Sequence, residues 1–217
     1  MTNQNLLNET IAFVKKELEN AEGGHDWFHI ERVYKNAVLI ANGETCDILI
    51  VQLGALLHDI ADSKFHDGDE TIGPKKAKLF LESKHVPENT IEHVINIIEN
   101  ISFKGGHETK KFSSLELDIV QDADRLDAIG AIGIARTFNY GGFKNRAIYN
   151  PEIKPNLNMS KEEYKNSDAP TINHFYEKLL LLKDRMNTKT GKEIAAQRHE
   201  FMEQFLTQFY AEWNGEK

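Results

Sequence analysis

Several features that define large protein classes are scarce in this sequence of 217 residues. Cys46 is the only cysteine, which excludes a disulfide framework and a zinc site built from thiolates. No apolar run reaches the ~18 residues of a membrane-spanning helix, and the start, MTNQNLLNET, lacks the apolar core of a secretion signal. We therefore expect a cytoplasmic protein that does not enter a membrane.

Positive charge is also scarce. The chain has 26 Lys and Arg against 34 Asp and Glu, so its formal net charge is −8. A nucleic-acid-binding protein needs a basic surface that displaces counterions from phosphates, so nucleic acid is disfavoured as a partner. A small anionic substrate is still compatible with this composition, provided that a metal ion and a few cations are focused at one site.

Helical periodicity recurs almost throughout the chain, and no segment alternates with period two. This pattern predicts an all-α fold in a single domain over residues 1–217. Ser113 and Glu116, like Thr190 and Glu193, have the spacing of capping boxes at helix starts. The expected helices cover residues 4–20, 26–42, 47–60, 74–84, 88–101, 115–139, 171–187 and 191–213.

Two regions differ from the remainder of the chain. Residues 141–170 are rich in Gly, Asn, Pro and Lys, which predicts a long loop that is either a functional lid or disordered. The last helix carries aromatic residues at four-residue spacing, namely Phe201, Phe205, Phe209 and Trp213. This aromatic stripe predicts core packing, with the seam of a homodimer as the alternative. Both a monomer and a homodimer therefore stay open.

Polar residues interrupt the apolar stretch LGALLHDIAD at residues 53–62. On a helical wheel, the leucines lie on one side, and His58, Asp59 and Asp62 lie together on the opposite side. Small and apolar residues fill the positions one turn earlier, so the helix is expected to be buried. A buried carboxylate without a partner is too costly to persist. This helix is therefore expected to deliver metal ligands or other paired polar groups into the interior.

A second polar stripe follows at the start of the helix HDWFHIERVYKNAVLIA. His25, His29, Arg32 and Asn36 are spaced by four, three and four residues, apart from the apolar stripe. Two histidines at i and i+4 can bind one metal ion, although such pairs are more often plain surface or core residues. The stripe therefore supports a metal site only when other ligands join it.

Asp124 is the fourth candidate ligand, because it shares a helix face with small alanines that let another helix approach closely. His29, His58, Asp59 and Asp124 together form a set of two imidazoles and two carboxylates. Nitrogen and oxygen ligands of this kind suit Mn, Fe, Co, Ni or Zn, and suit Mg less well. A complete protein cage would be structural, whereas open coordination positions would make the site catalytic.

The motifs His29-x-x-Arg32-Val33, His58-Asp59 and Ala123-Asp124-Arg125-Leu126 resemble the HD-domain superfamily of metal-dependent phosphohydrolases. The longer stretches HDWFHIERV, LLHDIADSKF and QDADRLDAIGAIGIARTF are similar to a bacterial subfamily of short, stand-alone HD hydrolases. The resemblance implies a helical bundle with a core at about residues 20–140 and additional C-terminal helices. It also implies that His29, His58, Asp59 and Asp124 are the metal ligands.

The activity that this resemblance implies is hydrolysis of a phosphate ester or phosphoanhydride, often in a nucleotide, by a phosphatase or a pyrophosphohydrolase. We expect one divalent ion per chain (Mn, Fe, Co, Ni or Mg), because the later histidines, His85, His93 and His107, read as surface residues. Ala61 stands where alarmone hydrolases of this family have a glutamate, which weakens that specificity. Two alternatives are a non-catalytic nucleotide sensor and a di-iron oxygenase with the same fold.

Further residues receive roles through their closeness to these motifs. Asp62 is the candidate general base or a carboxylate that orients water. His25 is a candidate acid for the leaving oxygen, and Arg32, on the His29 stripe, can neutralise phosphoryl charge. The candidate substrate-binding residues are the other cations near the motifs and in the long loop: Lys64, Lys104, Arg125, Lys144 and Arg146.

Overall fold

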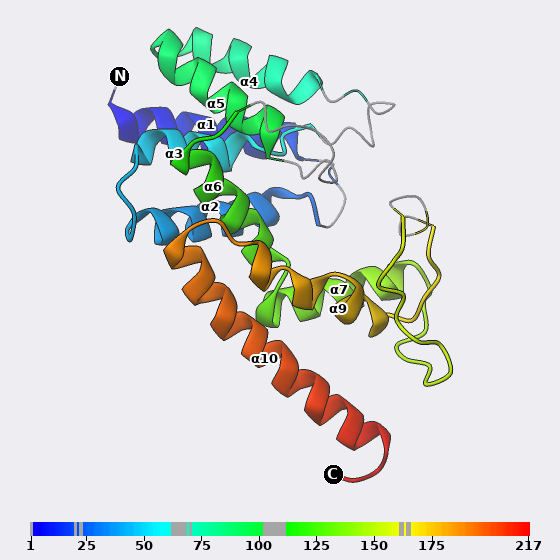
Figure 1. The fold of residues 1–217 in the computed structure, drawn as a ribbon. Helices are drawn as coiled ribbons and strands as arrows, with labels where there is room; N and C mark the ends of the chain where they lie inside the picture. Colours follow the sequence, from blue (N-terminus) through cyan, green and yellow to red (C-terminus); the bar gives the residue numbers. More distant parts are fainter. Residues whose placement is uncertain are drawn as a thin grey trace. The chain divides into compact units, whose positions relative to one another are not determined.

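The computed structural model describes residues 2–19, 21, 24–61, 69, 71–101, 112–160, 163 and 166–217. Within these residues the secondary structure is helical and contains no strand, which confirms the predicted all-α fold (Figure 1). Two compact units divide the chain, Met1–Asp124 and Arg125–Lys217. The expectation of one domain over the whole chain stays a prediction. Among the described helices, none has the length and apolar character needed to cross a membrane.

The helices of the two units follow each other in chain order. The first unit contains α1 (Asn3–Glu17), α2 (Trp27–Ala41), α3 (Ile48–Leu57), α4 (Ile72–Ser83), α5 (Glu88–Asn100) and most of α6 (Leu115–Asp127). The second unit contains α7 (Gly130–Phe143), α9 (Asn173–Glu177), the 3-10 turns η2 (Leu179–Leu181) and η3 (Lys183–Arg185), and α10 (Lys189–Trp213).

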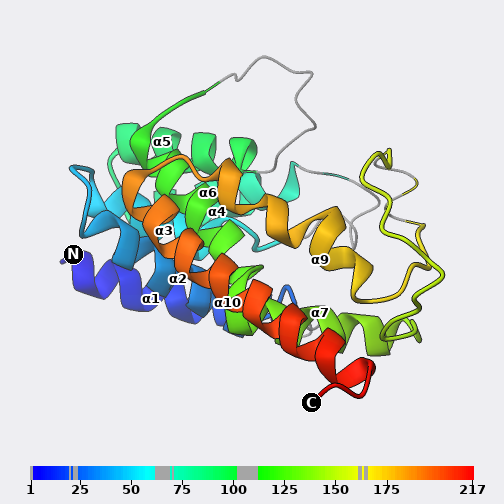
Figure 2. The ribbon, with the colours of Figure 1, turned by 60° about the horizontal axis from the view of Figure 1, so that its bottom comes forward.

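Helix α3 forms the centre of the first unit, which explains its apolar sequence. It packs against α1, α2 and α5, and Figure 2 shows it lying between α1 and α5. A Cβ atom at Gly54 would lie 3.3 Å from the Ile97 side chain and 3.4 Å from that of Val120. The missing side chain therefore lets α5 and α6 approach α3 closely. The expectation that this helix is buried is confirmed.

Two predicted helices are divided in the structure. The helix expected at 115–139 ends at Asp127 and restarts at Gly130, whose φ of 74° lies in the left-handed region that favours glycine. The helix expected at 171–187 is short α9 followed by two 3-10 turns. Lys178, with φ −143° and ψ −57°, leaves the helical region and ends α9.

Both predicted capping boxes were wrong by one or two residues. The Ser114 hydroxyl, not that of Ser113, accepts the backbone N–H of Leu117 at 3.1 Å. Thr188, not Thr190, caps α10 and accepts from the backbone N–H of Gly191 at 2.9 Å. In each case a neighbouring hydroxyl residue of the same kind stands where the backbone enters the helix.

The aromatic stripe of α10 is packed in its middle and exposed at its ends. The Phe205 ring lies 5.7 Å from that of Phe175, and the Phe209 ring lies 5.9 Å from that of Tyr149, measured between centroids. Phe201 and Trp213 are 48% and 51% exposed. Core packing therefore holds for the middle of the stripe but not for Phe201 and Trp213.

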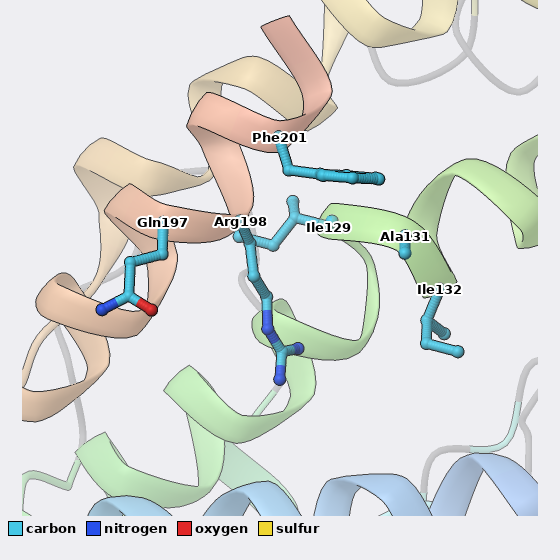
Figure 3. Close-up of a pocket in the computed structure, with 7 residues that line it drawn as sticks. Ile129, Ala131, Ile132, Gln197, Arg198 and Phe201 are labelled. Atoms are coloured by element: carbon cyan, nitrogen blue, oxygen red, sulfur yellow. The ribbon is translucent and has the colours of Figure 1, made fainter. Parts of the chain in front are cut away.

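A cavity of about 300 Å³ lies in the second unit between the start of α7 and α10. Figure 3 shows Phe201 extending from α10 over the start of α7. The lining is mostly apolar and comprises Ile129, Gly130, Ala131, Ile132, Gln197, Arg198 and Phe201. None of the predicted site residues that the structure describes is among the residues that line this cavity.

Candidate metal centre

The four predicted ligands come from three places in the first unit. His29 lies in the first turn of α2, where the N-cap Asp26 accepts its backbone N–H at 3.0 Å. The predicted helix 47–60 was too long, because it placed His58 and Asp59 inside the helix. In the structure His58 is the C-cap of α3 and Asp59 follows it, so both lie just beyond the helix. Asp124 lies near the end of α6.

The donor atoms of these residues converge. One donor atom from each of His29, His58 and Asp59 lies within 4.8 Å of the other two. Asp124 Oδ1 lies 3.5 Å from His29 Nε2 and 4.0 Å from His58 Nε2. Two ligands that are each about 2.1 Å from one ion can be up to about 4.2 Å apart. The separations to Asp124 therefore fit a shared divalent ion, and so does the chemistry of the donor set.

The hydrogen bond of His58 fixes which ring nitrogen can act as a ligand. His58 Nδ1 lies 2.9 Å from the carbonyl oxygen of Ala55, one turn earlier. A carbonyl can only accept, so Nδ1 carries the proton and donates it. Nε2, which faces Asp124, keeps its lone pair in the neutral ring. A histidine that binds a metal through one ring nitrogen is commonly oriented by a hydrogen bond from its other ring nitrogen to a backbone carbonyl.

Asp59 is held in place by His25. Asp59 Oδ2 and His25 Nδ1 are 2.6 Å apart, so the imidazole donates to the carboxylate. Burial alone would raise the pKa of Asp59, but the hydrogen bond from His25 and the positive potential of His58, His25 and His29 hold it below the usual value. Asp59 is therefore ionised at neutral pH, which is the form that binds a cation.

Asn36 makes a contact near the site, although the sequence analysis assigned it no specific role. It is buried on the same stripe of α2 as His29, and its Nδ2 donates to the carbonyl oxygen of Ala123 at 3.4 Å. This long hydrogen bond joins α2 to α6 one residue before Asp124. The available signal was the seven-residue spacing from His29, which places both side chains on one helix face. Arg32, between them in sequence, is half-buried.

The comparisons with known proteins agree with this geometry. The HD domain family matches residues 27–129, a span that contains all four candidate ligands. An HD-superfamily hydrolase from Bacillus thuringiensis is 46% identical, with a TM-score of 0.80, and the match covers 98% of this chain and 99% of that one. The chain belongs to the HD superfamily. Its fold is thus one used by hydrolases.

YpgQ of Bacillus subtilis is a second relative of this HD protein. In sequence it is 39% identical over 200 residues, which are 91% of this chain and 88% of YpgQ. The structure of YpgQ in complex with ADP superposes with a TM-score of 0.75, covering 98% of this chain and 97% of that chain. The sequence identity over that structural match is 34%.

The remaining predicted catalytic and substrate-binding residues fall into two groups. Asp62, Lys64 and Lys104 fall outside the described residues. Arg125, Lys144 and Arg146 belong to the second unit. Their assignment as functional residues stays a prediction.

Each of these three predicted substrate contacts has neighbours within the second unit. Arg125 donates to the carbonyl oxygen of Arg185 at 2.7 Å. Lys144 is exposed, and its ammonium lies 5.3 Å from the centre of the Phe143 ring. Arg146 donates to the carbonyl oxygen of Ser167. These contacts leave the Lys144 ammonium accessible to solvent.

The later histidines bear on the number of metal ions. His93 Nε2 lies 2.9 Å from the Ser114 hydroxyl and 3.4 Å from a Glu116 carboxylate oxygen. Among the described residues, the group with the spacing of metal ligands is the one that contains His29, His58 and Asp59. His107 lies outside the described residues. One ion per chain is therefore still a prediction.

Proposed function

We propose that this HD protein is a metal-dependent phosphohydrolase that cleaves a phosphate ester or phosphoanhydride of a nucleotide. The observation that carries the proposal is the convergence of two imidazoles and two carboxylates from α2, α6 and the end of α3. Two of the four are oriented from behind, His58 by the Ala55 carbonyl and Asp59 by His25. Such support is expected where ligand geometry matters for catalysis.

The proposed ligands of one divalent ion are His29, His58, Asp59 and Asp124. Their nitrogen and oxygen donors favour Mn, Fe, Co, Ni or Zn over Mg, and Mn is the first ion to test. When bound, such an ion lowers the pKa of water and neutralises charge on a phosphoryl group. The protein contributes an ionised Asp59 and a His58 ring that the Ala55 carbonyl orients before any ion arrives.

His25 and Arg32 are the proposed catalytic residues nearest to these ligands. His25 uses Nδ1 to hold Asp59, and in the protonated ring the Nε2–H is the proposed proton donor to a leaving oxygen. Arg32 lies one turn after His29 on α2, where its guanidinium can neutralise a substrate phosphate. Asp62 remains the proposed base. Lys64, Lys104, Arg125, Lys144 and Arg146 remain the proposed substrate contacts.

The nucleotide part of the proposal is supported by the relative YpgQ, whose structure has been solved with ADP. A bound nucleoside diphosphate is compatible with a substrate, with a product, and with a ligand that is sensed but not cleaved. A nucleotide sensor is therefore the second candidate function. The two functions differ in whether a phosphorus–oxygen bond is broken.

The test is release of phosphate and of pyrophosphate, measured separately. Metal-stripped protein is combined with Mn²⁺, Mg²⁺, Co²⁺, Ni²⁺, Fe²⁺ or Zn²⁺ and with nucleoside mono-, di- and triphosphates. We expect release that requires metal and that disappears in His58→Ala. His93→Gln is the matched control, because His93 binds Ser114 and Glu116 instead of the candidate ligands. Tight binding of nucleotide and metal without release of either product would favour the sensor.

A further inference from the structure

Three basic residues of the second unit gather around α9 and form what we call the basic cluster: Arg146, His174 and Lys178. The backbone N–H of Thr171 donates to the Ala147 carbonyl at 2.9 Å, which places Arg146 beside the start of α9. Lys178 follows His174 by one helical turn, with its N–H donating to the His174 carbonyl at 3.0 Å. Two segments that are distant in sequence therefore bring basic side chains together.

The cluster concentrates positive charge around a histidine. Burial lowers the pKa of His174, and the positive charges of Lys178 and Arg146 lower it further, to about 4. At neutral pH His174 is thus an uncharged imidazole with one N–H donor, next to a guanidinium and an ammonium.

Arg146 has one side-chain donor for which the described residues offer no acceptor. Its guanidinium lies 5.6 Å from the centre of the Tyr140 ring, and one Nη donates to the Ser167 carbonyl. Its Nε is buried and has no hydrogen-bond partner in the part of the chain that the structure describes. A buried donor without an acceptor costs free energy, so native proteins rarely keep one without a reason. An acceptor supplied by a ligand is such a reason.

We propose that the basic cluster binds a phosphoryl oxyanion, either inorganic phosphate or pyrophosphate or the phosphate chain of a nucleotide. A guanidinium matches the geometry of phosphate oxygens, and an ammonium adds a point charge. Lys178 is exposed, so an anion from solvent can reach the cluster. The nucleotide form rests on the proposed function, whereas binding of an inorganic anion does not.

The test uses the metal-stripped full-length chain with ¹⁵N-labelled histidine side chains. Phosphate, pyrophosphate and ADP are titrated in separate experiments at pH 7, and the ring signals of His174 are identified by their loss in His174→Gln. We expect one or more of these anions to shift the His174 signals. Bound anion also favours the protonated ring, so the pKa of His174 is expected to rise.

Charge variants separate the cluster from general electrostatic attraction. Lys178→Gln and Arg146→Gln are each expected to weaken anion binding by about tenfold, the effect of losing one charge-assisted contact. Lys189→Gln is the matched control, because Lys189 is exposed, lies on the same unit and removes the same charge. The exposed position of Lys178 makes its variant informative even if Arg146→Gln does not fold.

The outcomes distinguish the sources of the anion. Equal affinity for pyrophosphate and ADP would show that the phosphoryl groups suffice, and tighter binding of ADP would identify a nucleotide phosphate. The proposal is overturned if none of the anions shifts the His174 signals, or if Lys189→Gln weakens binding as much as Lys178→Gln. Hydrolysis is measured in a separate experiment. Absence of hydrolysis would therefore not affect the result for anion binding, and absence of anion binding would not affect the result for hydrolysis.

Discussion

The two units hold their polar groups in different ways. In the first unit, histidines and carboxylates stand at the ends of regular helices that pack around α3. In the second unit, the basic cluster stands on a short helix and on a turn segment that backbone hydrogen bonds join to it. Acidic residues clearly outnumber basic ones in the first unit, whereas the two are nearly balanced in the second.

This difference shows where each unit derives its geometry. The ligands of the first unit are placed by burial, since His29 is 3% and His58 9% exposed and Gly54 admits two neighbouring helices. The position of Arg146 in the second unit depends on individual backbone hydrogen bonds near Thr171. Packing in the first unit is spread over many side chains, so a single surface substitution should hardly move its helices. A substitution that removes one backbone hydrogen bond in the turns of the second unit should have a larger effect.

The largest effect is expected from removing charge at the proposed metal centre. Asp124→Asn keeps the size of a side chain that is 42% exposed, so the fold should persist. Metal-dependent release of phosphate is expected to fall by about 10³-fold or more, because metal catalysis contributes several kcal/mol to the barrier. The rate is measured at saturating metal, with circular dichroism as a check of the fold. Activity within tenfold of the wild type would exclude Asp124 as a ligand.

Glycine substitutions compare the packing of the two units directly. A Cβ at Gly133 would lie 2.2 Å from the backbone oxygen of Ala128, so the backbone must move in Gly133→Ala. We expect a loss of about 3 kcal/mol in the free energy of unfolding. Gly54→Ala meets only side-chain atoms at 3.3 Å and gains helix propensity, so a change within about 1 kcal/mol is expected. Urea unfolding measures both, and equal losses would contradict this account.

The pH dependence of stability tests His174, a half-buried histidine of the second unit. His174 has a pKa of about 4 in the folded chain against 6.5 when unfolded. Between these values the unfolded chain binds more protons, so the contribution of His174 is complete above pH 6.5 and is lost as the pH falls to 4. The loss is at most about 3 kcal/mol. His174→Gln should remove this part of the pH dependence, and an unchanged difference between pH 7 and pH 4 would show that His174 titrates normally.

The smallest effect is expected for the residue that supports Asp59 without being a proposed ligand. His25→Ala removes the donor at 2.6 Å, which should lower metal affinity by about 10- to 100-fold. His25→Asn places an amide donor near the position of Nδ1 and is expected to restore part of the affinity. Isothermal titration with Mn²⁺ provides the measurement. Equal affinities for His25→Ala and His25→Asn would mean that the hydrogen bond to Asp59 has no role in binding.

The sequence predicted the first unit better than the second for a physical reason. The periodic apolar faces of α1 to α5 predicted the ends of these helices within a few residues. The same helical-wheel analysis placed His29 and His58 apart from the apolar faces. The interruption before Gly130 was missed because the periodicity continues on both sides of it. The break at Lys178 has no residue signal, since lysine is a good helix former.

The sequence predicted which residues form the candidate site, but not the hydrogen bonds that hold them in place. Its four proposed ligands were identified together, because polar residues with small neighbours stand out on otherwise apolar helices. The hydrogen bonds that orient them required the structure. His25 meets Asp59, 34 residues later, and Asn36 meets Ala123, 87 residues later. Such pairs depend on how helices pack, which spacing along one helix does not encode.

The most direct test of the central claim is the number of metal ions that the chain binds. Metal-stripped wild type, His58→Ala and His93→Ala are equilibrated with Mn²⁺, and the ions bound per chain are counted by electron paramagnetic resonance of the free ion. We predict one tightly bound ion in the wild type and in His93→Ala, and none in His58→Ala. Undiminished binding by His58→Ala would contradict the account, because the ion would then be held elsewhere.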